Sequence, residues 1–91
     1  MKIQIKQFGD FLVSRPAGRE AFLAFKAYSR PQTATETIEL DFTDILVLAP
    51  SWADEFLTGI KSEFKNPVIC LPSQNASVIE TLRFLEIWPE S

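Results

Sequence analysis

The stretch of this chain best suited to present chemically useful side chains is Ser-Trp-Ala-Asp-Glu at positions 51–55. An apolar run at residues 45–48 precedes it, and Ala49-Pro50 separates the two. A strand that enters a helix through a proline presents polar side chains at the positively polarised end of that helix. We therefore expect residues 51–55 to form the functional surface of the molecule.

Ser51 has two interpretations. Its position predicts a helix N-cap, with Asp54 at the spacing of a capping box and Glu55 adding negative charge to the first turn. The alternative, which is implied by the family resemblance given at the end of this section, is a regulatory phosphorylation site. A phosphate on Ser51 would gain from the helix dipole but would be repelled by Asp54 and Glu55, so modification would loosen this helix end.

Acid–base and metal chemistry find little support in the residue types. Asp54 and Glu55 are adjacent on a helix, so they point about 100° apart and do not easily share one reacting centre. The chain has no His, which is the commonest general base and metal ligand, and no glycine-rich phosphate loop. Cys70 lies in an apolar run, which predicts a buried, inert thiol. We predict no catalytic residue, no metal and no cofactor.

Three further side chains are candidates for binding. Arg15 and Arg19 flank a predicted helix start, where two guanidinium groups could hold an anion or an acidic partner. The alternative, which we favour, is that they form salt bridges with acidic residues later in the chain. Trp52 is either a core residue or, if exposed, an interface anchor. The candidate partner-binding residues are Trp52, Asp54, Glu55, Arg15 and Arg19.

The elements of the N-terminal part are two short strands and a helix. Residues 2–6 alternate polar and apolar side chains and predict a half-buried strand. Residues 11–13 predict a second short strand or a buried link. A helix is expected from Ser14 or Arg15 to about residue 28, because a proline stands in its first turn. One face of this helix is expected to carry Phe22, Phe25 and either Tyr28 or Ser29, with Ala21, Ala24 and Ala27 close by.

Strands and helices alternate in the remainder of the chain. A central strand is expected at residues 36–42, and the run at 45–48 suits a segment buried on both sides. A helix over 51–65 has a core-facing stripe. A buried strand follows at 68–71, and a last helix runs over 76–87. The two stripes are Ala53, Phe56, Leu57, Ile60 and Phe64, and then Val78, Ile79, Leu82 and Leu85, with Phe84 and Trp88 beside the second. The candidate N-caps of the last helix are Ser73 and Asn75.

This alternation predicts an α/β fold in a single domain over residues 1–91. We expect a small mixed sheet of about four strands with about three helices packed against it. Nearly half of the residues (46%) are hydrophobic, which is enough for a core. The single cysteine, the absence of a long apolar segment and the alternating N-terminus favour a cytoplasmic protein without a membrane span.

Charge is distributed unevenly along the chain. Residues 1–31 hold six basic and two acidic side chains, whereas residues 32–91 hold three basic and ten acidic ones. Their net charges of +4 and −7 most simply become complementary when the halves pack; a charged docking face is the alternative. The overall charge of −3 argues against nucleic acid as a partner.

Two segments resemble STAS domains, the fold of anti-sigma-factor antagonists. Asp-Phe-Thr-Asp-Ile-Leu-Val-Leu-Ala-Pro-Ser at 41–51 is similar to the antagonist segment Asp-Leu-Ser-x-Val-x-Phe-x-Asp-Ser-Ser-Gly-Leu, and residues 71–82 are similar to the loop and last helix. The chain most resembles the STAS-like family of unknown function, whose members carry Ser-Phe-Ala-Asp-Glu where this chain has Ser51–Glu55. The likeness covers roughly residues 8–87.

The resemblance implies a non-enzymatic regulatory module that binds another protein. In STAS antagonists, the serine that matches Ser51 is phosphorylated by a histidine-kinase-like ATPase, which is also the binding partner. Ala49, Pro50 and Trp52 stand here where the antagonists have Asp, Ser and Gly, so a surface fitted to that kinase would differ. The alternatives are a small-ligand-binding domain and a structural subunit of a larger complex. We expect a monomer or a weak dimer.

Overall fold

The computed structural model describes residues 1–86. Within these residues, five short strands, three α-helices and one 3-10 helix follow one another. In order they are β1 (Lys2–Gln4), the 3-10 helix η1 (Ile5–Phe8), β2 (Phe11–Leu12), α1 (Arg15–Tyr28), β3 (Ile38–Asp41), β4 (Val47–Leu48), α2 (Pro50–Glu63), β5 (Val68–Cys70) and α3 (Ala76–Phe84).

The strands form two small parallel sheets. The larger has the order β1-β3-β5, and the smaller pairs β2 with β4. The α/β class and the three helices are thus as predicted, but the expected single mixed sheet is divided in two. The division occurs at two turns with positive φ, at Gly9 (118°) and Asp44 (65°), which separate β1 from β2 and β3 from β4.

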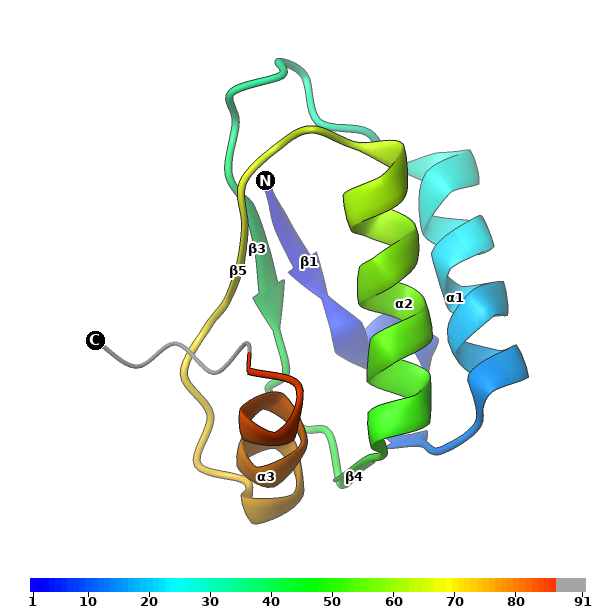
Figure 1. The fold of residues 1–91 in the computed structure, drawn as a ribbon, viewed down its shortest axis with the longest axis vertical. Coiled ribbons are helices and arrows are strands. Elements are labelled where there is room, and N and C mark those ends of the chain that lie inside the picture. Colours follow the sequence, from blue (N-terminus) through cyan, green and yellow to red (C-terminus); the bar gives the residue numbers. More distant parts are fainter. Residues whose placement is uncertain (87–91) are drawn as a thin grey trace.

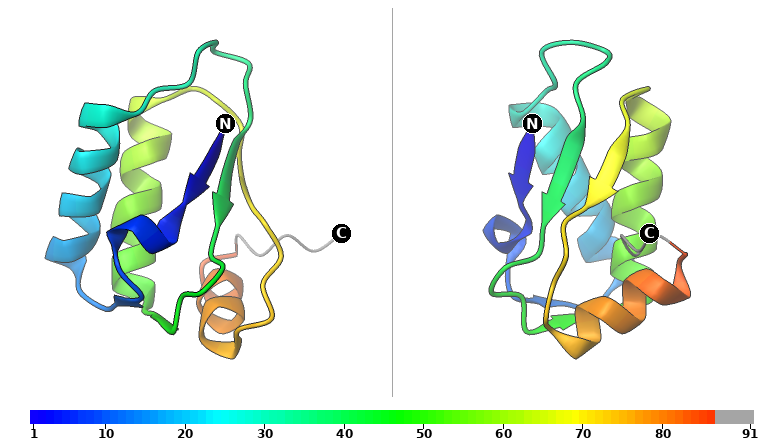
Figure 2. Two further views of the ribbon diagram at one scale, coloured as in Figure 1. Left: turned by 180° about the vertical axis from the view of Figure 1, so that it is seen from behind. Right: turned by 90° about the vertical axis from the view of Figure 1, so that its left-hand side faces the viewer.

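Helices α1 and α2 lie side by side and cover one face of the larger sheet (Figure 1). Helix α3 lies near the carboxyl ends of the strands of that sheet (Figure 1). Strand alternation explains which face is covered. One row of paired residues across β1, β3 and β5 is buried beneath the helices, and it consists of Ile3, Leu40 and Cys70. The alternate row, with Lys2 and Ile69, belongs to the face that the helices leave open (Figure 2).

The first predicted strand is shorter than expected. Residues 2–6 were predicted to be extended, but β1 ends at Gln4 and the chain winds into η1. Ile3 and Ile5 are still both buried, as the alternation predicted.

The core-facing stripe predicted for the helix over residues 51–65 is confirmed in α2, with Phe64 packed at the edge of the core.

Four apolar residues expected in or beside the core are exposed: Tyr28 (89%), Leu46 (61%), Ile69 (44%) and Phe84 (74%), so the strand expected at residues 68–71 is not buried throughout. Either Tyr28 or Ser29 was expected to share the face of α1 that carries Phe22 and Phe25, and Phe22, Phe25 and Tyr28 are three residues apart. Each such step turns about 60° away around an α-helix, so the third aromatic leaves the buried face. Leu46 precedes a strand of only two residues, so the expectation that residues 45–48 are buried on both sides was wrong.

The last helix begins where expected, with Asn75 as its N-cap: its side-chain oxygen accepts a hydrogen bond from the Val78 amide at 3.0 Å. It ends at Phe84, before the predicted residue 87. Trp88 and the end of that prediction lie outside the described residues. Within residues 1–86, no helix combines the length and the hydrophobicity that crossing a membrane requires.

Candidate functional site

The start of α2 differs from the predicted cap. Helix α2 begins at Pro50, and the N-cap position is held by Ala49, whose side chain makes no capping hydrogen bond. Ser51 instead lies in the first turn, and its hydroxyl donates to the carbonyl oxygen of Val13 at 3.2 Å. The prediction of Ser51 as N-cap was therefore wrong. Proline fits the first helical position because its fixed φ suits the helix and its missing N–H needs no cap.

Arg15 joins the two helices by an ion-pair cluster. Its Nη1 atom lies 3.0 Å from a carboxylate oxygen of Asp54 and 3.0 Å from one of Glu55. The hydrogen bonds to Asp54 and then Glu55 raise the pKa of Arg15 above its ordinary value. Arg19 is more loosely held, with its Nη1 atom 3.9 Å from Glu55.

Both arginines are paired within the chain. The two arginines form salt bridges with the acidic half of the chain, as we favoured. Lys26 and Glu63 add a third link between the same helices at 3.0 Å. The parallel arrangement of α1 and α2 explains the pairing, because their N-termini lie at the same end of the molecule (Figure 1).

The close approach of α1 and α2 depends on two glycines. A methyl group at Gly18 would lie 2.5 Å from the Trp52 carbonyl oxygen, and one at Gly59 would lie 2.6 Å from the Phe22 ring. The sequence carried one usable signal of this contact. Glycine inside a helix costs about 1 kcal/mol relative to alanine, so two such residues in otherwise regular helices indicate close packing.

Trp52 is a core residue. Only 1% of it is exposed, and its ring stacks on Phe56 with centroids 5.0 Å apart and an interplanar angle of 16°. Of the two interpretations in the sequence, the core one is therefore confirmed, and Trp52 offers no exposed surface to a partner. The exposed members of the candidate set are charged: about half of each of the Arg15 and Asp54 side chains remains accessible (53% and 48%).

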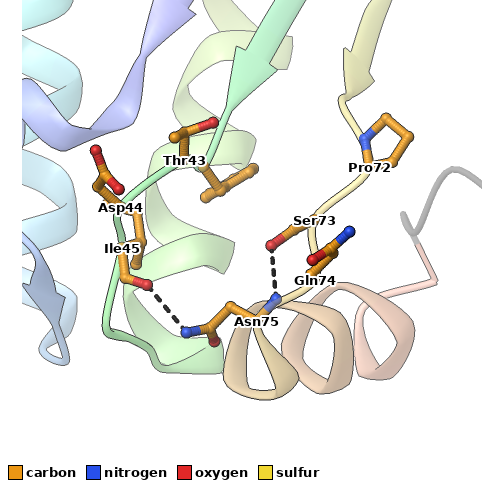
Figure 3. A pocket seen from close by; sticks show the side chains of 8 residues that line it. Thr43, Asp44, Ile45, Pro72, Ser73, Gln74 and Asn75 are labelled. Carbon is orange, nitrogen blue, oxygen red and sulfur yellow. Dashed lines mark hydrogen bonds between the residues drawn. The ribbon is translucent and has the colours of Figure 1, made fainter.

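A polar pocket lies at the carboxyl ends of β3 and β5, a location that the sequence did not indicate. Two loops line it, 42–45 after β3 and 72–75 before α3, and it encloses about 480 Å³ (Figure 3). Ligands of parallel α/β sheets characteristically bind at this edge. None of the candidate residues at the helix start lines this pocket.

The walls of the pocket are held by internal hydrogen bonds. The Asn75 amide group donates to the Ile45 carbonyl at 3.0 Å, and the Asn75 backbone N–H donates to the Ser73 hydroxyl at 3.1 Å, as Figure 3 shows. Behind Thr43, the Asp41 carboxylate accepts bonds from the Thr43 hydroxyl (2.6 Å) and backbone N–H (2.9 Å). These bonds from Thr43 lower the pKa of Asp41.

Cys70 is as the sequence predicted. The thiol is free, 4% exposed and packed in the core, and burial raises its pKa to about 11. A thiol in that state is protonated and unreactive at neutral pH. In residues 1–86, no three His, Cys, Asp or Glu side chains come together as a metal site would require.

Comparisons of the chain with protein-family models, with curated proteins and with solved structures found no match. The resemblance to STAS-like domains therefore stays a prediction from the sequence. What the structure adds is the arrangement of the motif: Ser-Trp-Ala-Asp-Glu at 51–55 packs against Ser14–Arg19, with Gly18 on the Trp52 backbone and Arg15 between Asp54 and Glu55.

Proposed function

We propose that this chain is a non-enzymatic regulatory module that binds a partner protein at the helix-start surface, defined as Val13, Arg15, Arg19, Ser51, Asp54 and Glu55. The observation that carries the proposal is the position of the exposed ion-pair cluster beside an exposed apolar side chain. Val13 is 45% exposed, and its carbonyl is bonded to Ser51 in the first turn of α2.

The charges of the helix-start surface suit recognition better than reaction. Arg15 engages both carboxylates with the same nitrogen, Nη1, so these acids are held in an ion-pair network. Arg19 is 65% exposed and only loosely paired, which leaves guanidinium donors available to an acidic group of a partner. A polar rim next to an apolar side chain is a common composition of protein interfaces.

The resemblance to STAS antagonists supplies the class of partner and the mode of regulation. In this proposal the partner is a histidine-kinase-like ATPase, and Ser51 is its phosphorylation site. The Ser51 hydroxyl is half-buried and donates to Val13, so a phosphate there would remove that hydrogen bond. The added charge would lie near Asp54, which repels it, so phosphorylation would separate β2 from α2 and alter the surface.

The experiment is a calorimetric titration of the purified chain with a histidine-kinase-like ATPase from the same organism. Asp54→Lys should weaken binding about tenfold or more. Glu63→Lys is the matched control, because Glu63 belongs to the same helix pair and also forms an exposed salt bridge, with Lys26. Equal affinities for the two variants would remove the helix-start surface from the proposal, and a lack of binding by the unmodified chain would remove the partner.

Phosphorylation has its own test. Incubation of the complex with ATP should add one phosphate to the wild-type chain and none to Ser51→Ala, as measured by intact mass. Phosphate found on another residue would exclude Ser51 as the regulated group. Trp52→Ala is unsuitable for either experiment, because emptying a buried tryptophan site typically costs about 3–5 kcal/mol of stability.

A small-ligand-binding domain is the second candidate, favoured by the pocket at the end of β3 and β5. Its volume of about 480 Å³ and its polar lining suit a small polar molecule. A screen of small polar metabolites by chemical-shift perturbation should then move the amides of Thr43 and Ser73, and Gln74→Trp should abolish the effect. Shifts spread over the whole molecule would argue against a defined site.

A further inference from the structure

A second surface lies on α1, away from the helix-start surface. It is a groove between α1 and the segment formed by η1 and β2, and it encloses about 380 Å³. The residues that line it are Phe8, Phe11, Leu12, Ala17, Glu20, Ala21, Ala24 and Trp52. Seven of these eight residues have apolar side chains, and the eighth, Glu20, carries a carboxylate.

Helix geometry separates this groove from the proposed partner surface. Arg15, Arg19 and Lys26 share one flank of α1 and form ion pairs with α2. At about 3.6 residues per turn, Ala17, Glu20 and Ala24 lie on the other flank, toward β2. The two surfaces can therefore be altered independently.

The groove exposes apolar area that the fold does not cover. Phe11 is 63% exposed although it lines the groove. Phe8 also lines the groove and is only partly buried. Ala17 and Ala24 are exposed small residues, so a bound chain could approach the helix backbone closely there. Large exposed aromatic side chains beside a concave apolar surface are typical of binding sites.

The charge of the groove indicates what would fill it. Glu20 is exposed, and no cation of residues 1–86 forms an ion pair with it. No Lys or Arg lines the groove either. A ligand that placed a Lys or Arg opposite Glu20 would satisfy this carboxylate, whereas an acidic ligand would be repelled.

We propose that this groove binds a peptide segment of a partner protein that carries a large aliphatic or aromatic side chain next to a Lys or Arg. The apolar side chain lies against Phe11 over Ala17 and Ala24, and the basic group pairs with Glu20. This interaction needs none of the residues of the helix-start surface, so it holds or fails separately from the proposed function.

The test is selection of a random peptide library displayed on phage against the immobilised chain, followed by anisotropy titrations of the selected peptides. We expect the selected peptides to share a large apolar residue adjacent to a basic one. Ala24→Gln, which adds bulk inside the groove without charge, should weaken them about tenfold or more. Ala27→Gln is the matched control, because Ala27 is exposed on the same helix and does not line the groove.

Charge exchange tests the pairing with Glu20. Glu20→Lys should weaken a selected peptide, and replacing the basic residue of that peptide by Glu should restore its binding to Glu20→Lys. Asp54→Lys should leave the affinity unchanged, which separates this groove from the helix-start surface. Selected peptides without a basic residue, or peptides indifferent to Ala24→Gln, would overturn the proposal. So would concentration-dependent dimerisation that Ala24→Gln abolishes, since a second copy of the chain would then occupy the groove.

Discussion

Gly18 of α1 lies directly against the backbone of Trp52 in α2, where a methyl group on Gly18 would come within 2.5 Å of the Trp52 carbonyl oxygen. This contact sets the separation of the two helices at the point where Arg15 reaches Asp54 and Glu55. The residues that hold the helices together and the residues of the helix-start surface are therefore neighbours, and the geometry of the surface depends on a residue without a side chain.

Gly18→Ala should destabilise the protein. Helix propensity alone would make this change favourable by about 1 kcal/mol, but the clash is with backbone, which does not rotate away. Overpacking of this kind costs about 1–3 kcal/mol. Urea unfolding should show the loss, and Ala27→Gly, at an exposed position of the same helix, calibrates the propensity effect in the opposite direction. A more stable Gly18→Ala protein would disprove the close contact.

Thr81→Val should loosen α3 from β4. The buried Thr81 hydroxyl donates to the Leu48 carbonyl at 2.5 Å, and the Ser77 hydroxyl accepts from the Leu48 N–H at 3.0 Å. Valine keeps the shape but removes the donor, and a poorly satisfied buried carbonyl costs about 1–3 kcal/mol. Thermal unfolding measures the effect. Thr58→Val, at an exposed position of α2, should change stability far less, and equal losses would contradict the assignment.

Thr43→Val should reduce stability at neutral pH and change it little in acid. Hydrogen bonds from Thr43 lower the folded-state pKa of Asp41. A depressed carboxyl pKa stabilises the fold above the unfolded-state pKa of about 4, and this contribution is lost as the pH falls through the lower folded value. Urea titrations of the wild type and Thr43→Val should differ at neutral pH and converge in acid, once Asp41 is protonated in the folded state as well. Thr35→Val, in the exposed loop before β3, serves as the control.

Cys70 should react with a thiol reagent only when the protein opens. Burial raises its pKa to about 11, so the thiolate is scarce at neutral pH and the sulfur is inaccessible. The labelling rate with a disulfide reagent should rise with urea in parallel with unfolding followed by circular dichroism. Fast labelling of the native protein, at the rate of a free thiol in solution, would show that Cys70 is not buried as described.

Most members of the helix-start surface were named from the sequence, but Trp52 is buried and Val13 was missed. The motif at 51–55 and the two arginines were found from residue type and spacing, and the preference for salt bridges followed from the charge asymmetry of the chain. The cap was wrong, because the sequence does not show that Ala49 would be extended with Pro50 as the first helical residue. The backbone of Trp52 lies against Gly18, which is 34 positions away in the sequence.

By itself the sequence determined the order and type of the elements, because hydrophobic periodicity, prolines and capping residues act over a few neighbouring positions. It predicted α1 and α2 nearly to the residue, and the inward face of β3. Tertiary structure decided what depends on contacts between distant segments. It divided the strands into two sheets, placed Leu46 at the surface, and formed both the groove beside Glu20 and the pocket beside Thr43. Concave surfaces form only when separate elements pack, so no local pattern in the chain records them.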